Sequence, residues 1–226
     1  MDPAPCLARI AVPRYRVGDD PGMRMRRRVS TAEAFEAQEP SLDGRCFAYV
    51  FPCVWEDHCK IGYSHDPLSR IAALHRRWFE FFDLDRAVLV EAETERDARD
   101  LELELRRPLS AHRAPAPMAV RVQAGGQTEW VRGAAAALEQ AVDALARRGH
   151  RVHAPAADWL RAALQERSER LYEWTWARLS SDELDGLVAM TPGARVVRDS
   201  LDACAALGID LEAHLPPAVL HWYRRG

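Results

Sequence analysis

The sequence predicts an α+β fold, in which a small, mostly antiparallel three-stranded sheet is flanked by helices and followed by an all-helical C-terminal region. Two observations support this prediction. Between residues 45 and 150, short runs of aromatic and β-branched residues alternate with segments whose apolar residues recur at helical spacing. From about residue 155 onward the helical spacing dominates. We therefore expect a basic arm over residues 1–44, an α/β domain over 45–150 and a helical region over 151–226.

The first two strands are expected to form a hairpin. Residues 46–51 and 59–63 are mostly apolar, and the polar segment between them predicts a turn. A helix follows, because Asp66 can accept from the free N–H groups of a helix start and Pro67 suits the first helical position. The apolar spacing extends this helix to about residue 82.

The later elements follow the same patterns. Residues 87–92 are apolar and β-branched, which predicts a third strand, and Thr94 can cap a helix that runs to about residue 107. Two further short strands are expected over 118–122 and 128–131. Further helices are expected over residues 134–148, 157–178, 181–190, 194–207 and 217–225.

Composition excludes several classes of protein. Hydrophobic residues make up 48% and charged residues 29%, which is typical of a chain that forms a core and not of a disordered one. No apolar run approaches the roughly 20 residues that span a bilayer. The N-terminus lacks a basic stretch followed by an apolar one, so we expect a cytoplasmic protein without membrane contact.

The cysteines do not predict a disulfide framework. There are five of them, an odd number, and they are scattered, so free thiols in a reducing compartment are expected. Cys46, Cys53 and Cys59 lie close in sequence to His58, which leaves a zinc site open as an alternative. No C-x2-C pair is present, however, and small apolar packing is the preferred interpretation.

Basic residues gather locally in a chain whose formal net charge is −3. Seven arginines fall within the first thirty residues, and a second group consists of Lys60, Arg70, Arg76 and Arg77. Such patches can steer a polyanion even when the whole protein is slightly acidic. Pairing with nearby acids, or simple solvation, is the alternative explanation.

Four residues of the α/β domain have the chemistry that phosphodiester cleavage needs. Tyr49 lies on the first strand and Lys60 on its partner, where a cation could lower the pKa of the phenol. Arg70, at the edge of the following helix, can hold a phosphate oxygen with a forked pair of donors. Glu102, on a later helix, could bind one Mg²⁺ that keeps most of its waters. The alternatives are packing for Tyr49, and solvated faces for Arg70 and Glu102.

These residues belong to an ordered set of motifs: Phe47-Ala48-Tyr49, Lys60-Ile61-Gly62, Asp66-Pro67-Leu68-Ser69-Arg70, Leu101-Glu102 and Glu129-Trp130-Val131. The set resembles the GIY-YIG endonuclease superfamily, in particular the branch typified by an open reading frame of phage T5. The resemblance covers about residues 45–145. It implies a DNA endonuclease that depends on Mg²⁺ or Mn²⁺.

The resemblance also implies roles for individual residues. Tyr49 corresponds to the tyrosine proposed as general base or water-positioning group, Arg70 to the arginine that stabilises the transition state, and Glu102 to the metal ligand. Lys60 stands where the second motif often has tyrosine. For contact with nucleic acid we expect Gly62, His65, Arg76, Arg77 and Arg106, and Glu129 receives no catalytic role.

Three positions depart from the family pattern. Phe47-Ala48 replaces a glycine-isoleucine pair, Arg106 stands where histidine is common, and Val131 replaces an aromatic residue. These departures leave a second hypothesis open, a catalytically inactive nucleic-acid-binding or regulatory protein with the same fold.

A third hypothesis is a phage-type structural or protein-interaction protein. Exposure of Trp174 and Trp176 would favour it, because exposed aromatic rings commonly mark interfaces. The C-terminal helices are accordingly the expected site of a homo-oligomer contact or of a protein partner.

Overall fold

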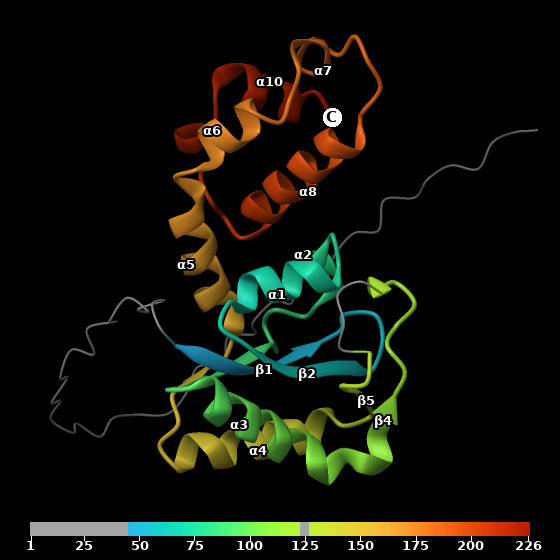
Figure 1. Ribbon diagram of the computed structural model, residues 1–226, viewed down its shortest axis with the longest axis vertical. Coiled ribbons are helices and arrows are strands. Elements are labelled where there is room, and N and C mark those ends of the chain that lie inside the picture. Colours follow the sequence, from blue (N-terminus) through green and yellow to red (C-terminus); the bar gives the residue numbers. More distant parts are fainter. Residues whose placement is uncertain (1–44, 123–126) are drawn as a thin grey trace, which may run out of the picture. The chain divides into compact units, whose positions relative to one another are not determined.

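A six-stranded antiparallel sheet organises the first part of the computed structural model, which describes residues 45–122 and 127–226 (Figure 1). The basic arm expected over residues 1–44 lies outside these ranges. The strand order is β4-β5-β2-β1-β3-β6. The strands are β1 (Cys46–Pro52), β2 (His58–Ser64), β3 (Val88–Ala92), β4 (Arg113–Ala114), β5 (Trp130–Arg132) and β6 (Val152–His153). The α+β class predicted from the sequence is therefore confirmed, and so is the helical C-terminal region.

The central strand β1 is buried along its whole length because both of its edges are paired and both of its faces are covered. It pairs with β2 as the expected hairpin, in a register that places Tyr49 opposite Gly62. On its other edge it pairs with β3, and Leu89 lies opposite Tyr49. This arrangement fixes which side chains share a face of the sheet.

The predicted strand number of three was too small. The three long strands are those expected, and β5 overlaps the short strand expected over 128–131. β5 and β4 extend the sheet beyond β2, and β6 extends it beyond β3. Neither β4 nor β6 was predicted, because two residues are too few to show an alternating pattern in the sequence.

The strand expected over 118–122 was also wrong. Val120 N–H instead donates to the carbonyl of Pro117 in a turn, and Arg113–Ala114 pairs with β5. Pro115 and Pro117 have no N–H group to donate to a ladder, which explains why pairing ends before them.

The helix expected over 67–82 forms as two shorter helices, α1 (Pro67–Leu74) and α2 (Trp78–Phe81). Asp66 caps α1 as predicted, since its side chain accepts from Ser69 N–H at 2.9 Å. The break falls at His75, whose backbone is extended. The His75 ring stacks on Phe81 at 4.4 Å and its Nδ1 accepts from Arg77 N–H, so side-chain contacts hold the kink.

The two faces of the sheet are covered by different helices (Figure 1). Helices α3 (Glu95–Arg106) and α4 (Ala135–Arg147) pack on one face, with the short 3-10 helix Arg107–His112 following α3. Helices α1, α2 and α5 (Ala156–Ser168) pack on the other. Alternation along β1 therefore directs Tyr49 to the face of α1.

The C-terminal region has its own small core, built around Val197, Leu201 and Val219. Its further helices are α6 (Leu171–Trp176), α7 (Ser181–Asp185), α8 (Pro192–Ala206), α9 (Leu211–His214) and α10 (Pro217–Arg224). The helix expected over 157–178 splits after Ser168, whose hydroxyl donates to the Gln165 carbonyl at 2.6 Å and competes with the regular helical bonds.

The tryptophans of α6 lie in different environments. Trp176 is 56% exposed, whereas Trp174 is half-buried beneath the Arg178 guanidinium, 5.3 Å from its ring centre. One of the two rings that the interaction hypothesis needs is thus accessible. In the described part of the chain no helix has the length and apolarity needed to cross a membrane.

Side chains of the C-terminal helices also reach the sheet layer and α1. Trp159 and Leu160 of α5 belong to the same core cluster as Tyr49 and Ile71. Arg167 donates to Asp66 at 2.6 Å, so a residue of α5 holds the capping residue of α1. The start of α1 is therefore fixed by two separate parts of the chain.

Candidate active site

The candidate site begins with Tyr49 and Arg70. The Tyr49 ring is 1% exposed and stacks on Phe51, with ring centres 4.3 Å apart. Arg70, one turn into α1, donates from Nε to the phenolic oxygen at 3.1 Å. Strand β1 and helix α1 thus bring the predicted tyrosine and the predicted arginine into direct contact.

Gly62 makes room for this tyrosine. It lies opposite Tyr49 in the ladder, and a Cβ atom added to it would stand 2.3 Å from the phenolic oxygen and 2.5 Å from Cζ. Both distances are far below normal contact, so the ring could not stay where it is. The space above Gly62, which we expected nucleic acid to approach, is occupied by the phenol.

We expect Gly62→Ala to destabilise the fold by about 1–3 kcal/mol, because the added methyl group overpacks the interior and displaces Tyr49 from Arg70. The measurement is the free energy of unfolding in urea. Gly193→Ala is the matched control, since its added Cβ would meet nothing closer than 3.6 Å. Equal stability of the two variants would contradict the proposed role of Gly62.

Lys60 is fully buried and is paired with a residue that the sequence analysis left without a role. Its Nζ lies 2.5 Å from Glu129 Oε2 and 5.8 Å from the centre of the Trp130 ring. The Glu129 side chain remains 33% exposed. The Ile61 N–H also donates to the Glu129 carbonyl at 3.0 Å, which fixes the backbone of both segments.

The expected effect of Lys60 on Tyr49 is not found. Burial raises the pKa of Tyr49 above its ordinary value of 10, and the charge that opposes this rise is Arg70. Burial lowers the pKa of Lys60, although the hydrogen bond that its amine donates to Glu129 favours the charged form. At neutral pH Tyr49 is therefore a protonated phenol that can donate a hydrogen bond, not a preformed phenolate.

Glu102 influences Tyr49 and Lys60 electrostatically. It is a buried carboxylate on α3, and its negative charge adds to the rise in the pKa of Tyr49 and opposes the fall in the pKa of Lys60. Its Oε1 accepts from Arg106 Nε at 2.6 Å, one helical turn further along. Arg106, one of the three departures from the family pattern noted above, therefore holds the carboxylate directly.

The other residues expected to contact nucleic acid lie elsewhere. His65 is exposed and its Nε2 lies 3.4 Å from Glu95, while Arg76 lies 3.2 Å from Asp199 of α8. Arg77 donates to Glu80 and, at 2.7 Å, to Asp202 of α8. These two arginines thus join α2 to α8 as well as carrying positive charge.

A metal at this site would rely mainly on one carboxylate. The described residues contain no cluster of three or more histidine, cysteine, aspartate or glutamate side chains placed to bind an ion. A single buried carboxylate oxygen fits Mg²⁺, which often binds through one or two carboxylates and keeps several waters. Glu102 is the residue that would hold it, by the oxygen that Arg106 does not occupy.

The cysteines within the described ranges are packing residues. Cys46, Cys53, Cys59 and Cys204 are free thiols and all four are buried. Burial raises the pKa of Cys53 to about 12 and that of Cys59 to about 11, so these thiols are protonated at neutral pH. A protonated, buried thiol is a poor metal ligand and a poor nucleophile.

Comparison with known proteins supplies no relative. No family model, no curated protein and no solved structure matches the chain.

Proposed function

We propose that this protein is a divalent-metal-dependent endonuclease that hydrolyses DNA phosphodiester bonds, with an active site of the GIY-YIG type. The observation that carries the proposal is the hydrogen bond from Arg70 Nε to the Tyr49 hydroxyl, on the face of the sheet that also holds Gly62. A phenol donor beside a guanidinium is suited to a phosphate whose negative charge grows in the transition state.

Each residue has a distinct part in the proposed reaction. Arg70 stabilises the charge that develops on the phosphate oxygens. Because Tyr49 accepts from Arg70 and keeps its own proton, it donates to the attacking water or to a phosphate oxygen and orients it. Lys60 and Glu129 form an ion pair that supports the structure of the site. A divalent ion held by Glu102 would supply Lewis-acid charge and a more acidic water.

Glu102→Gln is the variant that tests this proposal. We expect it to lower the rate at which supercoiled plasmid is nicked in Mg²⁺ or Mn²⁺ by at least about 100-fold, since even residues behind a metal ligand commonly contribute 10–100-fold. The amide keeps the size of the side chain but loses the charge that binds the ion. The readout is the initial rate of conversion to open circles.

Glu104→Gln serves as the matched control, because Glu104 lies on the same helix but is exposed and pairs with Arg148. It should cut at the wild-type rate. Plasmid that stays intact with the wild-type protein in both metals, or cutting that is unchanged in both Glu102→Gln and Arg70→Ala, would rule out the proposed site.

One observation favours a second candidate, a nucleic-acid-binding or regulatory protein that does not cut. The bond from Arg106 to Glu102 neutralises the carboxylate on which metal binding depends. This candidate predicts DNA binding that weakens with salt, without nicking at any metal concentration. Metal-dependent nicking that disappears in Glu102→Gln would exclude it.

A further inference from the structure

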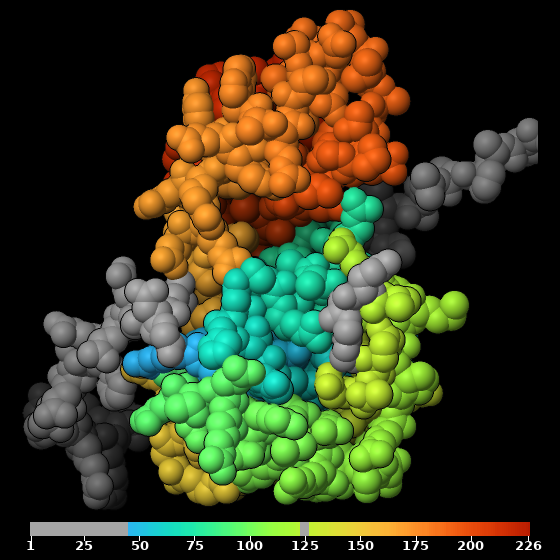
Figure 2. Space-filling model, in the orientation of Figure 1, coloured from blue at the N-terminus to red at the C-terminus, as the bar shows by residue number. Residues whose placement is uncertain are grey.

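A second basic site lies where α1, α2 and α8 meet. It is a cavity of about 360 Å³ between the α1–α2 connection, residues 119–121 and the first turns of α8. In Figure 2 the α1–α2 segment, in blue-green, borders both the orange helices of the C-terminal region and the yellow-green segment that precedes residue 123. The charged groups in its lining are Arg76, Arg77, Arg121, Arg195, Arg198 and Asp199.

The positive charge of this cavity exceeds the negative charge around it. Asp199 balances Arg76 at 3.2 Å, and Arg77 is balanced by Glu80 and Asp202. Within the described residues no carboxylate lies within ion-pair distance of the other three arginines, Arg121, Arg195 and Arg198. Three guanidinium groups that have no carboxylate partner in residues 45–122 and 127–226, gathered in one concave site, are suited to bind an anion.

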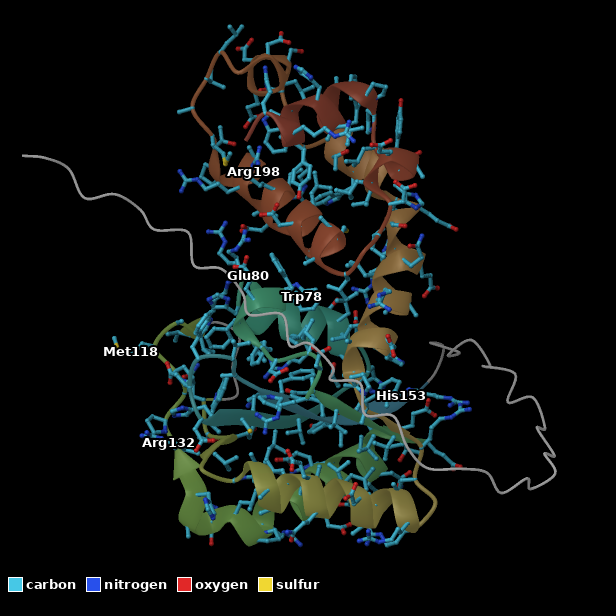
Figure 3. The ribbon with its side chains drawn as sticks, turned by 180° about the vertical axis from the view of Figure 1, so that it is seen from behind. Trp78, Glu80, Met118, Arg132, His153 and Arg198 are labelled. Atoms are coloured by element: carbon cyan, nitrogen blue, oxygen red, sulfur yellow. The ribbon has the colours of Figure 1, made fainter. Side chains whose placement is uncertain are left out.

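Arg198 is held rigidly in the wall of this cavity. Its two terminal nitrogens donate to the carbonyls of Tyr223 and Trp222, and its guanidinium lies 4.8 Å from the centre of the Trp222 ring. Its Nε is buried and has no hydrogen-bond partner among the described residues. Figure 3 shows Arg198 on α8, across from Glu80 and Trp78 of α2. The charge is therefore fixed before any ligand arrives, which reduces the entropy cost of binding.

Helix α1 joins this cavity to the candidate active site. Arg70 lies within α1, and His75, which lines the cavity, directly follows its last residue, Leu74. Four residues of helix advance about 6 Å along its axis. One strand of DNA carries a phosphate for about every 3.4 Å of its own axis, so a single strand is long enough to reach both Arg70 and the cavity.

We propose that this cavity binds a backbone phosphate of the DNA strand whose scissile phosphate lies at Arg70. The proposal rests on the proposed function for the identity of the ligand. It assigns Arg121 and Arg195 as its binding groups, with Arg198 supplying a fixed positive charge in the wall. Forked guanidinium donors bind phosphate in preference to singly charged small anions, because they match its geometry as well as its charge. Bound in this way, the strand is held at two points along α1.

The test measures DNA binding apart from cutting. The double variant Arg121→Gln/Arg195→Gln removes two exposed charges that take part in no ion pair of the described structure, so the fold should be kept. Affinity for a fluorescein-labelled duplex is measured by anisotropy in EDTA over a series of salt concentrations. We expect the slope of log affinity against log salt to become shallower by about 0.9, because the variant neutralises one phosphate fewer than the wild type.

The control is Arg147→Gln/Arg170→Gln, which removes the same charge from exposed positions on α4 and before α6 and should keep the wild-type slope. Equal slopes in the two double variants, or a wild-type protein that binds no DNA, would overturn the proposal.

Inorganic phosphate alone is titrated in a parallel melting experiment. If phosphate stabilises the wild type and not the Arg121→Gln/Arg195→Gln variant while their DNA slopes agree, the ligand is a free anion and the DNA assignment fails. A protein that shows the slope change but never nicks plasmid would refute the nuclease proposal and leave only the binding of a DNA phosphate in this cavity.

Discussion

Arg70→Ala is expected to slow plasmid nicking by about 10²–10³-fold, because it removes the guanidinium that faces the developing phosphate charge and the donor that positions Tyr49. Arg70→Lys should restore only part of this rate, since an ammonium keeps the charge but cannot reproduce the forked donor geometry. Initial rates under saturating Mg²⁺ measure both effects. Melting temperatures of the two variants separate a catalytic effect from a folding one.

A second arginine variant is the matched control for this comparison. Arg147→Ala removes an exposed arginine from α4, on the other face of the sheet, and should nick at the wild-type rate. If Arg70→Ala also nicks at that rate while remaining folded, Arg70 has no part in the reaction. DNA affinity should change far less than the rate, because the transition state carries the charge that Arg70 meets.

Glu129→Ala is expected to cost about 3 kcal/mol of folding free energy at pH 7, which for a chain of this size lowers the melting temperature by about 6–12 °C. The reason is the fully buried Lys60 amine, which is deprived of its partner at 2.5 Å. Urea denaturation monitored by tryptophan fluorescence measures the destabilisation.

The dependence of this destabilisation on pH identifies its cause. Burial lowers the pKa of folded Lys60, so between that pKa and the unfolded value near 10.5 the unfolded chain binds more protons, and stability rises with pH. Removing Glu129 lowers the folded pKa further and widens this window. The difference between wild type and Glu129→Ala should therefore shrink as the pH approaches 10.5, and a difference that stays constant would refute the buried-charge explanation.

Two further variants complete the cycle. Lys60→Met replaces the buried charge by an apolar chain and leaves Glu129 partly exposed to water, so it should cost less than Glu129→Ala, and the double variant should regain much of the stability. Glu104→Ala breaks an ion pair whose two side chains are each 51% exposed, and its cost should stay below about 1 kcal/mol.

Local patterns explain what could be predicted from the sequence. The hairpin of β1 and β2, the Asp66 cap and the start of α1 depend on residues only a few positions apart, and all three have the expected form. The contact between Tyr49 and Arg70 follows from that local geometry. Of the edge strands, β5 overlaps the strand expected over 128–131, whereas β4 and β6 could not be predicted, because they are held by pairing partners and not by any pattern of their own.

Long-range contacts explain what was missed in the site. Glu129 stands 69 residues from Lys60, and only its place in the Glu129-Trp130-Val131 motif indicated that it matters. Arg76 and Arg77 appeared to be ordinary cations beside the site, and their acidic partners on α8 lie far along the chain, with Asp202 standing 125 residues from Arg77. The sign of the Tyr49 pKa shift depends on burial, which the spacing of charged residues cannot reveal.

The pairing of β5 with β2 has a consequence for how the chain folds. The hairpin of β1 and β2 closes over a few residues and can form early, whereas β5 reaches β2 only after an intervening segment that contains α1, α2, β3, α3 and β4. Before β5 pairs with β2, Glu129 is not yet beside Lys60. A charged amine that lacks this carboxylate is more stable in water than in an apolar core. Pairing of β5 with β2 is thus the step that brings Glu129 to the buried lysine, so we expect the site to form together with this part of the sheet.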